Sequence, residues 1–115
     1  MDEGGGGMDI VFHDRIYRED ISDRKMASIQ KKIQKRSPKL NLFLVTLPIG
    51  NQGILEIYWY PELLQPFYQR RKQKVVVVGV AMSREAAYEL VEKIIKDVGF
   101  QDGVIPVTEF FEEKT

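Results

Sequence analysis

Aromatic and basic side chains gather in one stretch of the chain, between residues 58 and 74. Aromatic rings offer flat apolar surfaces, and Arg and Lys neutralise carboxylates or phosphates. The candidate contacts in this stretch are Tyr58, Tyr60, Leu63, Phe67, Tyr68, Arg70, Arg71 and Lys72, and Lys74 ends the basic run. Because Tyr, Trp and Arg are enriched at interface hot spots, the combination favours a surface that binds a partner protein.

The same residue types are also the ingredients of single-stranded nucleic-acid or RNA binding, in which bases stack on rings and cations contact phosphates. A second basic group supports this alternative, since residues 24–39 hold seven Lys or Arg and no acid. Its members at the end of an expected helix form a secondary patch of Lys31, Lys32, Lys35 and Arg36. A basic run is more often simply solvated, so nucleic acid is the second interpretation, behind a protein partner.

The sequence contains few residues in a pattern that could catalyse a reaction. His13 is the only histidine, and its neighbour Asp14 would point to the opposite side of an extended chain. The serines lack the motif of a nucleophile elbow, and Glu56 and Glu62, the acids nearest the aromatic stretch, come from different elements. We therefore predict no catalytic residue, no metal site and no cofactor, and we interpret the chain as a non-enzymatic binding module with His13 in a turn.

Length and composition indicate one small domain. The chain has 115 residues, equal numbers of basic and acidic side chains, and no cysteine, which excludes disulfides and thiolate metal sites. No apolar run approaches the roughly 18 residues of a membrane-spanning helix, so a cytoplasmic location is expected, with no membrane contact. Residues 1–7, with four glycines, are expected to form a flexible tail in front of a single domain at 8–115.

Two helices are expected among the elements that position the candidate contact residues. Met26, Ile29 and Ile33 recur at helical spacing and predict a helix over 23–36, with Ser22 as its cap. A wider apolar face follows Ser83 and predicts a second helix that ends at Gly99. Residues 61–65 fit a single helical turn because proline is favoured at the first helical position.

The strands are expected at 40–47, 54–60 and 74–82. In the second strand, Leu55, Ile57 and Trp59 alternate with Tyr58 and Tyr60, so we expect the first three in the core and the two tyrosines on a wet face. Residues 48–53 supply the Gly and Asn of a hairpin loop. Shorter strands are expected around the turn at residues 13–14. Because Pro106 cannot donate to a ladder, the C-terminal segment is expected to form an edge strand or an extended arm. The predicted fold class is α+β, an antiparallel meander sheet with two helices packed on one face.

A family resemblance is carried by two segments, LFLVTLPIGNQGILEIYWYPELLQPFYQ at 42–69 and VVVVGVAMSREAAYELVEKIIKDV at 75–98. In these segments the chain resembles an uncharacterised family of short bacterial cytoplasmic proteins with no known activity. The similarity extends over about residues 9–111. It implies a bacterial cytoplasmic origin and adds no activity, cofactor or site residue.

Overall fold

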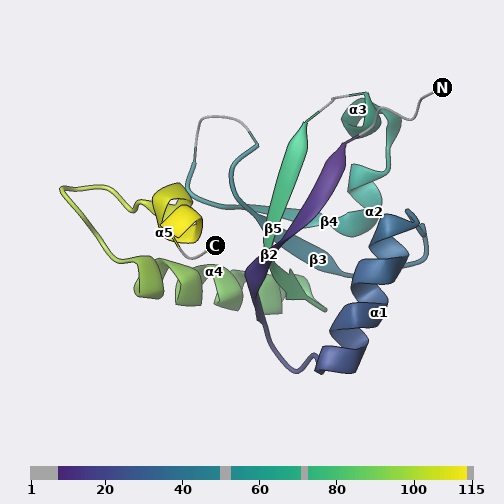
Figure 1. Cartoon of the computed structure of the whole chain (residues 1–115), viewed down its shortest axis with the longest axis horizontal. Helices are drawn as coiled ribbons and strands as arrows, with labels where there is room; N and C mark the ends of the chain where they lie inside the picture. Colours follow the sequence, from purple (N-terminus) through teal and green to yellow (C-terminus); the bar gives the residue numbers. More distant parts are fainter. Residues whose placement is uncertain (1–7, 50–52, 71–72, 114–115) are drawn as a thin grey trace.

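The computed structural model of the chain describes residues 8–49, 53–70 and 73–113. Its strands form one small sheet, with the helices around it (Figure 1). The strands are β2 (Asp9–Arg18), β3 (Phe43–Thr46), β4 (Glu56–Trp59) and β5 (Lys74–Ala81). The helices are α1 (Asp23–Gln34), α2 (Tyr60–Leu63), α3 (Pro66–Gln69), α4 (Arg84–Val98) and α5 (Val107–Glu113). The expected tail at 1–7 and the tip of the expected hairpin loop, 50–52, lie outside the described residues.

The fold is α+β, but its four-stranded sheet is mixed and not an antiparallel meander. The strand order is β2-β5-β3-β4, in which β3 is antiparallel to both β4 and β5 while β2 runs parallel to β5. The predicted meander is wrong because the chain leaves β4 through α2 and α3, and β5 then returns beside β3. A strand as apolar as β5 needs neighbours on both edges, and β2 supplies the second one.

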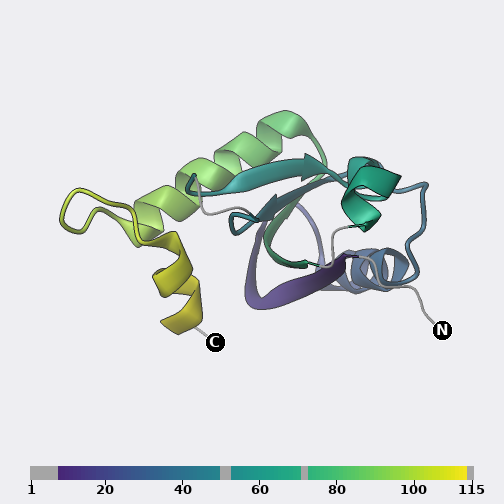
Figure 2. The same ribbon diagram turned by 90° about the horizontal axis from the view of Figure 1, so that it is seen from above.

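The two long helices cover opposite faces of the sheet, as the view from above shows (Figure 2). On one face, Met26, Ile29 and Ile33 of α1 pack in a cluster with Leu44 and Val77. On the other face, α4 packs through residues that include Ala87, Leu90 and Ile94, against Val45 and Val78. The prediction of both helices on one face is therefore wrong. Because β3 and β5 are apolar on both alternating sets, both of their faces must be covered.

A bulge in β5 affects how closely α4 packs on the sheet. Val45 pairs with Gly79 and Thr46 with Val77, so Val78 is an extra residue in the ladder. A Cβ on Gly79 would lie 3.1 Å from Cβ of Val45 and 3.4 Å from Cδ1 of Leu90. Glycine therefore lets α4 approach the sheet closely at this point.

The N-terminal strand does not turn back at residues 13–14 as expected. It continues to Arg18 with a register shift between Phe12 and Tyr17, and residues 13–16 bulge out of the ladder. His13 is buried in this bulge, where its Nδ1 accepts from the Arg15 amide at 3.0 Å. Its Nε2 therefore carries the hydrogen and donates to the Phe111 carbonyl oxygen at 2.8 Å. The histidine holds α5, so it is not a turn residue.

The C-terminal segment forms a helix where an edge strand or an extended arm was expected. Apart from an isolated bridge between Gln101 and Val104, the described residues after α4 lead into α5. Pro106 precedes the helix, and its carbonyl oxygen accepts from the Phe110 amide at 3.0 Å. Val107 and Phe111 are buried against α4, so the apolar face decided the conformation. Within the described ranges, no helix is long and apolar enough to cross a membrane.

Candidate functional site

Two of the predicted contact residues lie in the core. Tyr60 and Leu63 are both 0 % exposed and belong to the cluster on the α1 face of the sheet. The expected alternation ends at Trp59, because α2 begins at Tyr60 with Pro61 in its first turn, and the helical turn directs Tyr60 inward. Among the residues that the structure describes, the Tyr60 hydroxyl has no hydrogen-bond partner, and burial raises its pKa. Neither side chain can contact a partner in this structure.

Tyr58 and Tyr68 are half-buried, so each ring packs against the core and is also partly exposed at the surface. Their rings meet edge to face with 5.8 Å between centroids, and both pack against the same core cluster. The Tyr58 hydroxyl donates to Oε1 of Glu56 at 2.8 Å, and the same oxygen accepts from the Ile49 amide at 2.9 Å. Burial, together with this bond to a carboxylate, raises the Tyr58 pKa well above its ordinary value.

Trp59 was assigned to the core, and this prediction is wrong. The side chain is 41 % exposed, and its indole Nε1 donates to Oδ1 of Asn41 at 2.9 Å. The reason is that β4 is a sheet edge of only four residues, and Trp59 is its last. Its neighbours Leu55 and Ile57 are partly buried against the α4 side, as the alternation predicts.

The exposed part of the predicted site comprises the short helix α3 and the basic residues after it. Phe67 is 58 % exposed, and Arg70 is also exposed. The basic run continues in Arg71 and Lys72, which lie outside the described residues, and in Lys74, which is exposed. The usable contacts are therefore fewer than the sequence suggested.

Hydrogen bonds join this segment to the secondary basic patch. Nη1 of Arg36 donates to Oε1 of Gln69 at 2.5 Å, and Nε2 of Gln69 donates to the Leu63 carbonyl at 2.6 Å. Arg36 follows α1 with a φ of 56°, a left-handed conformation that ends the helix and turns the chain. Its Nη2 also donates to the Met8 carbonyl at 3.3 Å. One side chain thus ties the end of α1 to α3.

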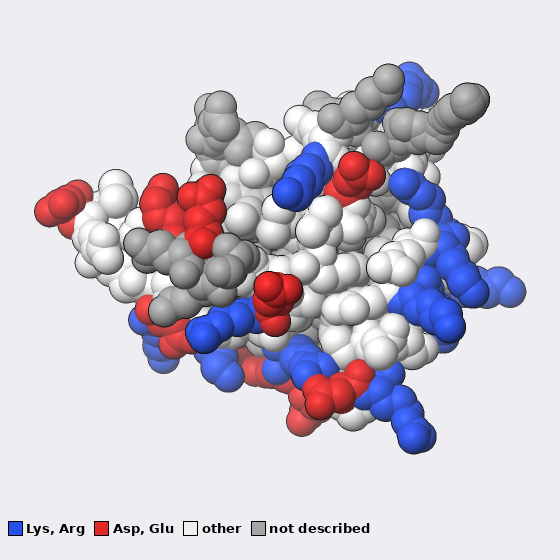
Figure 3. Space-filling model, in the orientation of Figure 1, with Lys and Arg blue, Asp and Glu red and all other residues white. Residues whose placement is uncertain are grey.

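Charge separates along the molecule. Lys31 and Lys32 on α1 and Lys35 at its C-cap are exposed, and none of them has an ion-pair partner within the described residues. Figure 3 shows Lys and Arg along the side formed by α1, and Asp and Glu gathered at the opposite end over α5. We define the α1–α3 surface as exposed residues of the two segments that the Arg36–Gln69 bond joins, namely Lys31, Lys32, Lys35, Arg36, Phe67 and Arg70.

Comparisons with known protein families, with curated proteins and with solved structures find no match for this chain. The resemblance to a bacterial family stays a prediction. Among the residues that the structure describes, no group of three or more His, Asp or Glu is placed to hold a metal ion.

Sequence reasoning could not have found the link between the two basic groups. Arg36 and Gln69 are 33 positions apart, and neither residue type signals a tertiary contact. One feature of the sequence could have predicted that Trp59 is exposed. Pro61 lies two positions further on, and β4 ends before it, so Trp59 is the last residue of the ladder.

Proposed function

We propose that the protein is a small non-enzymatic binding module that docks an acidic segment of a partner protein on the α1–α3 surface. The observation that carries the proposal is the Arg36–Gln69 hydrogen bond, which places an exposed aromatic ring and Arg70 on an element tied to the cations of α1. An apolar anchor beside charges is the usual composition of an interface centre and its rim. Lys31, Lys32 and Lys35 have no ion-pair partner within the described chain. The carboxylates of an acidic segment would supply such partners.

The arrangement of the rings favours protein over nucleic acid. Single-stranded binding relies on open ring faces on which successive bases stack. Of the four predicted rings, Tyr60 is buried, Tyr58 and Tyr68 are half-buried against each other, and Phe67 is the one that is largely exposed. Nucleic acid remains the second candidate because the exposed lysines of α1 could contact phosphates without any stacking.

The test is an NMR titration of the labelled protein with a peptide rich in Glu and one aromatic residue. Amide shifts should appear in α1 and α3, and Phe67→Ser together with Lys35→Glu should abolish them. A single-stranded RNA of matched charge serves as the competing probe. RNA that shifts the α1–α3 surface while the peptide does not would establish the second candidate instead.

Matched controls separate the surface from general effects of charge and hydrophobicity. Phe100 is 74 % exposed beyond α4, and Lys96 is exposed on α4, so Phe100→Ser and Lys96→Glu repeat the same chemical changes elsewhere. Both control variants should bind the peptide like the wild type. If they lose binding to the same extent as Phe67→Ser and Lys35→Glu, the proposed surface is wrong.

A further inference from the structure

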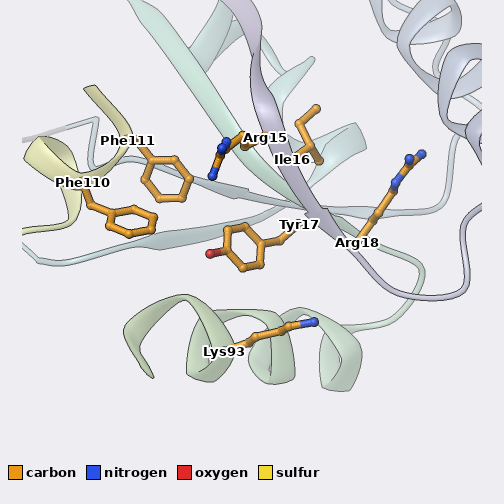
Figure 4. Close-up of a pocket in the computed structure, with 7 residues that line it drawn as sticks. All are labelled: Arg15, Ile16, Tyr17, Arg18, Lys93, Phe110 and Phe111. Carbon is orange, nitrogen blue, oxygen red and sulfur yellow. The ribbon is translucent and has the colours of Figure 1, made fainter. Parts of the chain in front are cut away.

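A cavity of about 310 Å³ lies where β2, α4 and α5 meet. Figure 4 shows the side chains that line it. They comprise three cations, three aromatic rings and one aliphatic side chain, namely Arg15, Arg18, Lys93, Tyr17, Phe110, Phe111 and Ile16. The cavity shares no residue with the α1–α3 surface.

The walls of the cavity are held by contacts between distant parts of the chain. The bulge of β2 places Arg15 and Ile16 outside the regular ladder. His13 fixes the backbone of α5 at Phe111, and the Tyr17 hydroxyl donates to Oδ2 of Asp97 on α4 at 2.6 Å. The rings of Tyr17 and Phe111 meet edge to face with 6.1 Å between centroids. The site is therefore formed before any ligand arrives.

The three cations of this cavity differ in whether they already form hydrogen bonds or ion pairs. Arg18 forms an ion pair with Asp23 and donates to the Ser22 carbonyl oxygen. Arg15 and Lys93 have no side-chain hydrogen bond or ion pair within the described residues. The nearby carboxylate of Asp97 is occupied by the Tyr17 hydroxyl. Two positive charges that line the cavity thus have no side-chain hydrogen bond or ion pair among the described groups.

We propose that this cavity binds a small aromatic anion, a flat ring that carries a carboxylate or a phosphate. The guanidinium of Arg15 presents paired N–H donors that match either oxyanion, and Lys93 adds a second positive charge. Figure 4 shows the Arg15 side chain directed toward the rings of Tyr17 and Phe111. A ligand ring can therefore pack against those aromatic walls while its anionic group meets the guanidinium.

Size and lining define the ligand class more closely. Ligand cavities in proteins range from about 300 to about 1,000 Å³, so this one suits a molecule of one ring. A bare anion would not use the apolar surface that Phe110 and Phe111 present to the cavity. A neutral aromatic compound would leave Arg15 and Lys93 unpaired.

Titration of the full chain with benzoate and with phenyl phosphate, followed by amide NMR shifts, tests the proposal. Both probes should shift residues 15–18, 93 and 110–111, and whichever binds more tightly identifies the oxyanion. Inorganic phosphate and benzamidine are the comparison probes, since one lacks the ring and the other reverses the charge. Binding of either comparison probe as tight as that of the aromatic anions would overturn the proposal.

Two substitutions and two matched controls locate the binding. Arg15→Gln and Lys93→Gln should each weaken the affinity for the aromatic anion about tenfold or more, because each removes a charged hydrogen bond. Arg24→Gln on α1 and Lys96→Gln on α4 remove the same charges from exposed positions outside the cavity and should leave the affinity unchanged. If Arg15→Gln fails to fold, the affinity of Lys93→Gln tests the site, because Lys93 is exposed on α4 and its replacement should leave the fold intact. Unchanged affinity in Lys93→Gln would refute the site.

Discussion

His13 and Tyr17 show how single side chains of β2 hold elements far away in the sequence. The His13 bond spans 98 positions to Phe111, and the Tyr17 bond spans 80 positions to Asp97. Both rings also pack edge to face on Phe111. The bulge of β2 is therefore the point where the two ends of the described chain are joined.

Replacing His13 by leucine should destabilise the fold by about 2 kcal/mol, because the Phe111 carbonyl and the Arg15 amide lose their partner while the volume is largely kept. Urea denaturation measures the loss. The exposed neighbour supplies the control, since Asp14→Asn should change stability by no more than about 0.5 kcal/mol. Equal stability of His13→Leu and the wild type would show that the histidine does not hold α5.

Tyr17 should make stability fall at alkaline pH. Burial, followed by the hydrogen bond and the charge of Asp97, raises the Tyr17 pKa from 10.0 to about 12. The unfolded state therefore ionises first as the pH rises, and the stabilisation present below pH 10 is lost between pH 10 and about 12. Denaturation midpoints of the wild type and Tyr17→Phe across this range measure the difference. The Tyr17→Phe curve should be the flatter one, and parallel curves would contradict the assignment.

At the scale of elements, the contact between β5 and α4 depends on the absence of a side chain at Gly79. The bulge of β5 brings this residue opposite Val45 and below Leu90. The cap at Ser83 then starts α4 directly after the strand, with the Ala86 amide donating to Oγ of Ser83 at 3.1 Å. The helix has no freedom to move away without breaking its start or its packing.

Gly79→Ala should therefore destabilise the protein by about 1–3 kcal/mol through overpacking against Val45 and Leu90. A double-mutant cycle with Val45→Ala, measured by chemical denaturation, tests the mechanism. The double variant should lose less stability than the sum of the single losses, because the smaller residue makes room for the new methyl group. Strict additivity would mean that the cost of Gly79→Ala arises elsewhere.

At the scale of the whole molecule, the formal charges cancel but are not evenly placed. The cations of α1 and the acids around α5 occupy opposite ends, as Figure 3 shows. An acidic partner approaching from solution is attracted to one end and repelled from the other, which orients the encounter. The α1–α3 surface thus lies at the basic end, whereas the cavity beside α5 is a local group of three cations, Arg15, Arg18 and Lys93, next to the acidic end.

The rate of association with the acidic peptide should fall as ionic strength rises from about 0.05 to about 0.5 M, because screening weakens the attraction to the lysines of α1. Stopped-flow fluorescence of a labelled peptide measures the rate. In Lys32→Glu with Lys35→Glu, the rate should be lower at low salt and nearly independent of salt. A salt dependence as steep as that of the wild type would show that other cations attract the peptide.

The local elements could be predicted from the sequence because their signals are local. Ser22 caps α1 and Ser83 caps α4 as expected, and Gly99 ends α4 with a φ of 75°. The apolar stripe of Met26, Ile29 and Ile33 is buried. Periodicity and capping involve residues a few positions apart, so they can be recognised in the chain itself.

Only the tertiary structure decided how these elements combine. Strand alternation says which positions face a core, but it carries no information on strand order or direction, so the parallel β2–β5 pair had to come from the packing of the whole chain. The same is true of Tyr60 in the core, Trp59 at the surface, and the bond from Arg36 to Gln69. The sequence by itself determined the two long helices α1 and α4, their caps and a basic aromatic segment. The fold decided which of those side chains remain exposed and which distant groups they meet, because both depend on contacts between residues far apart in the chain.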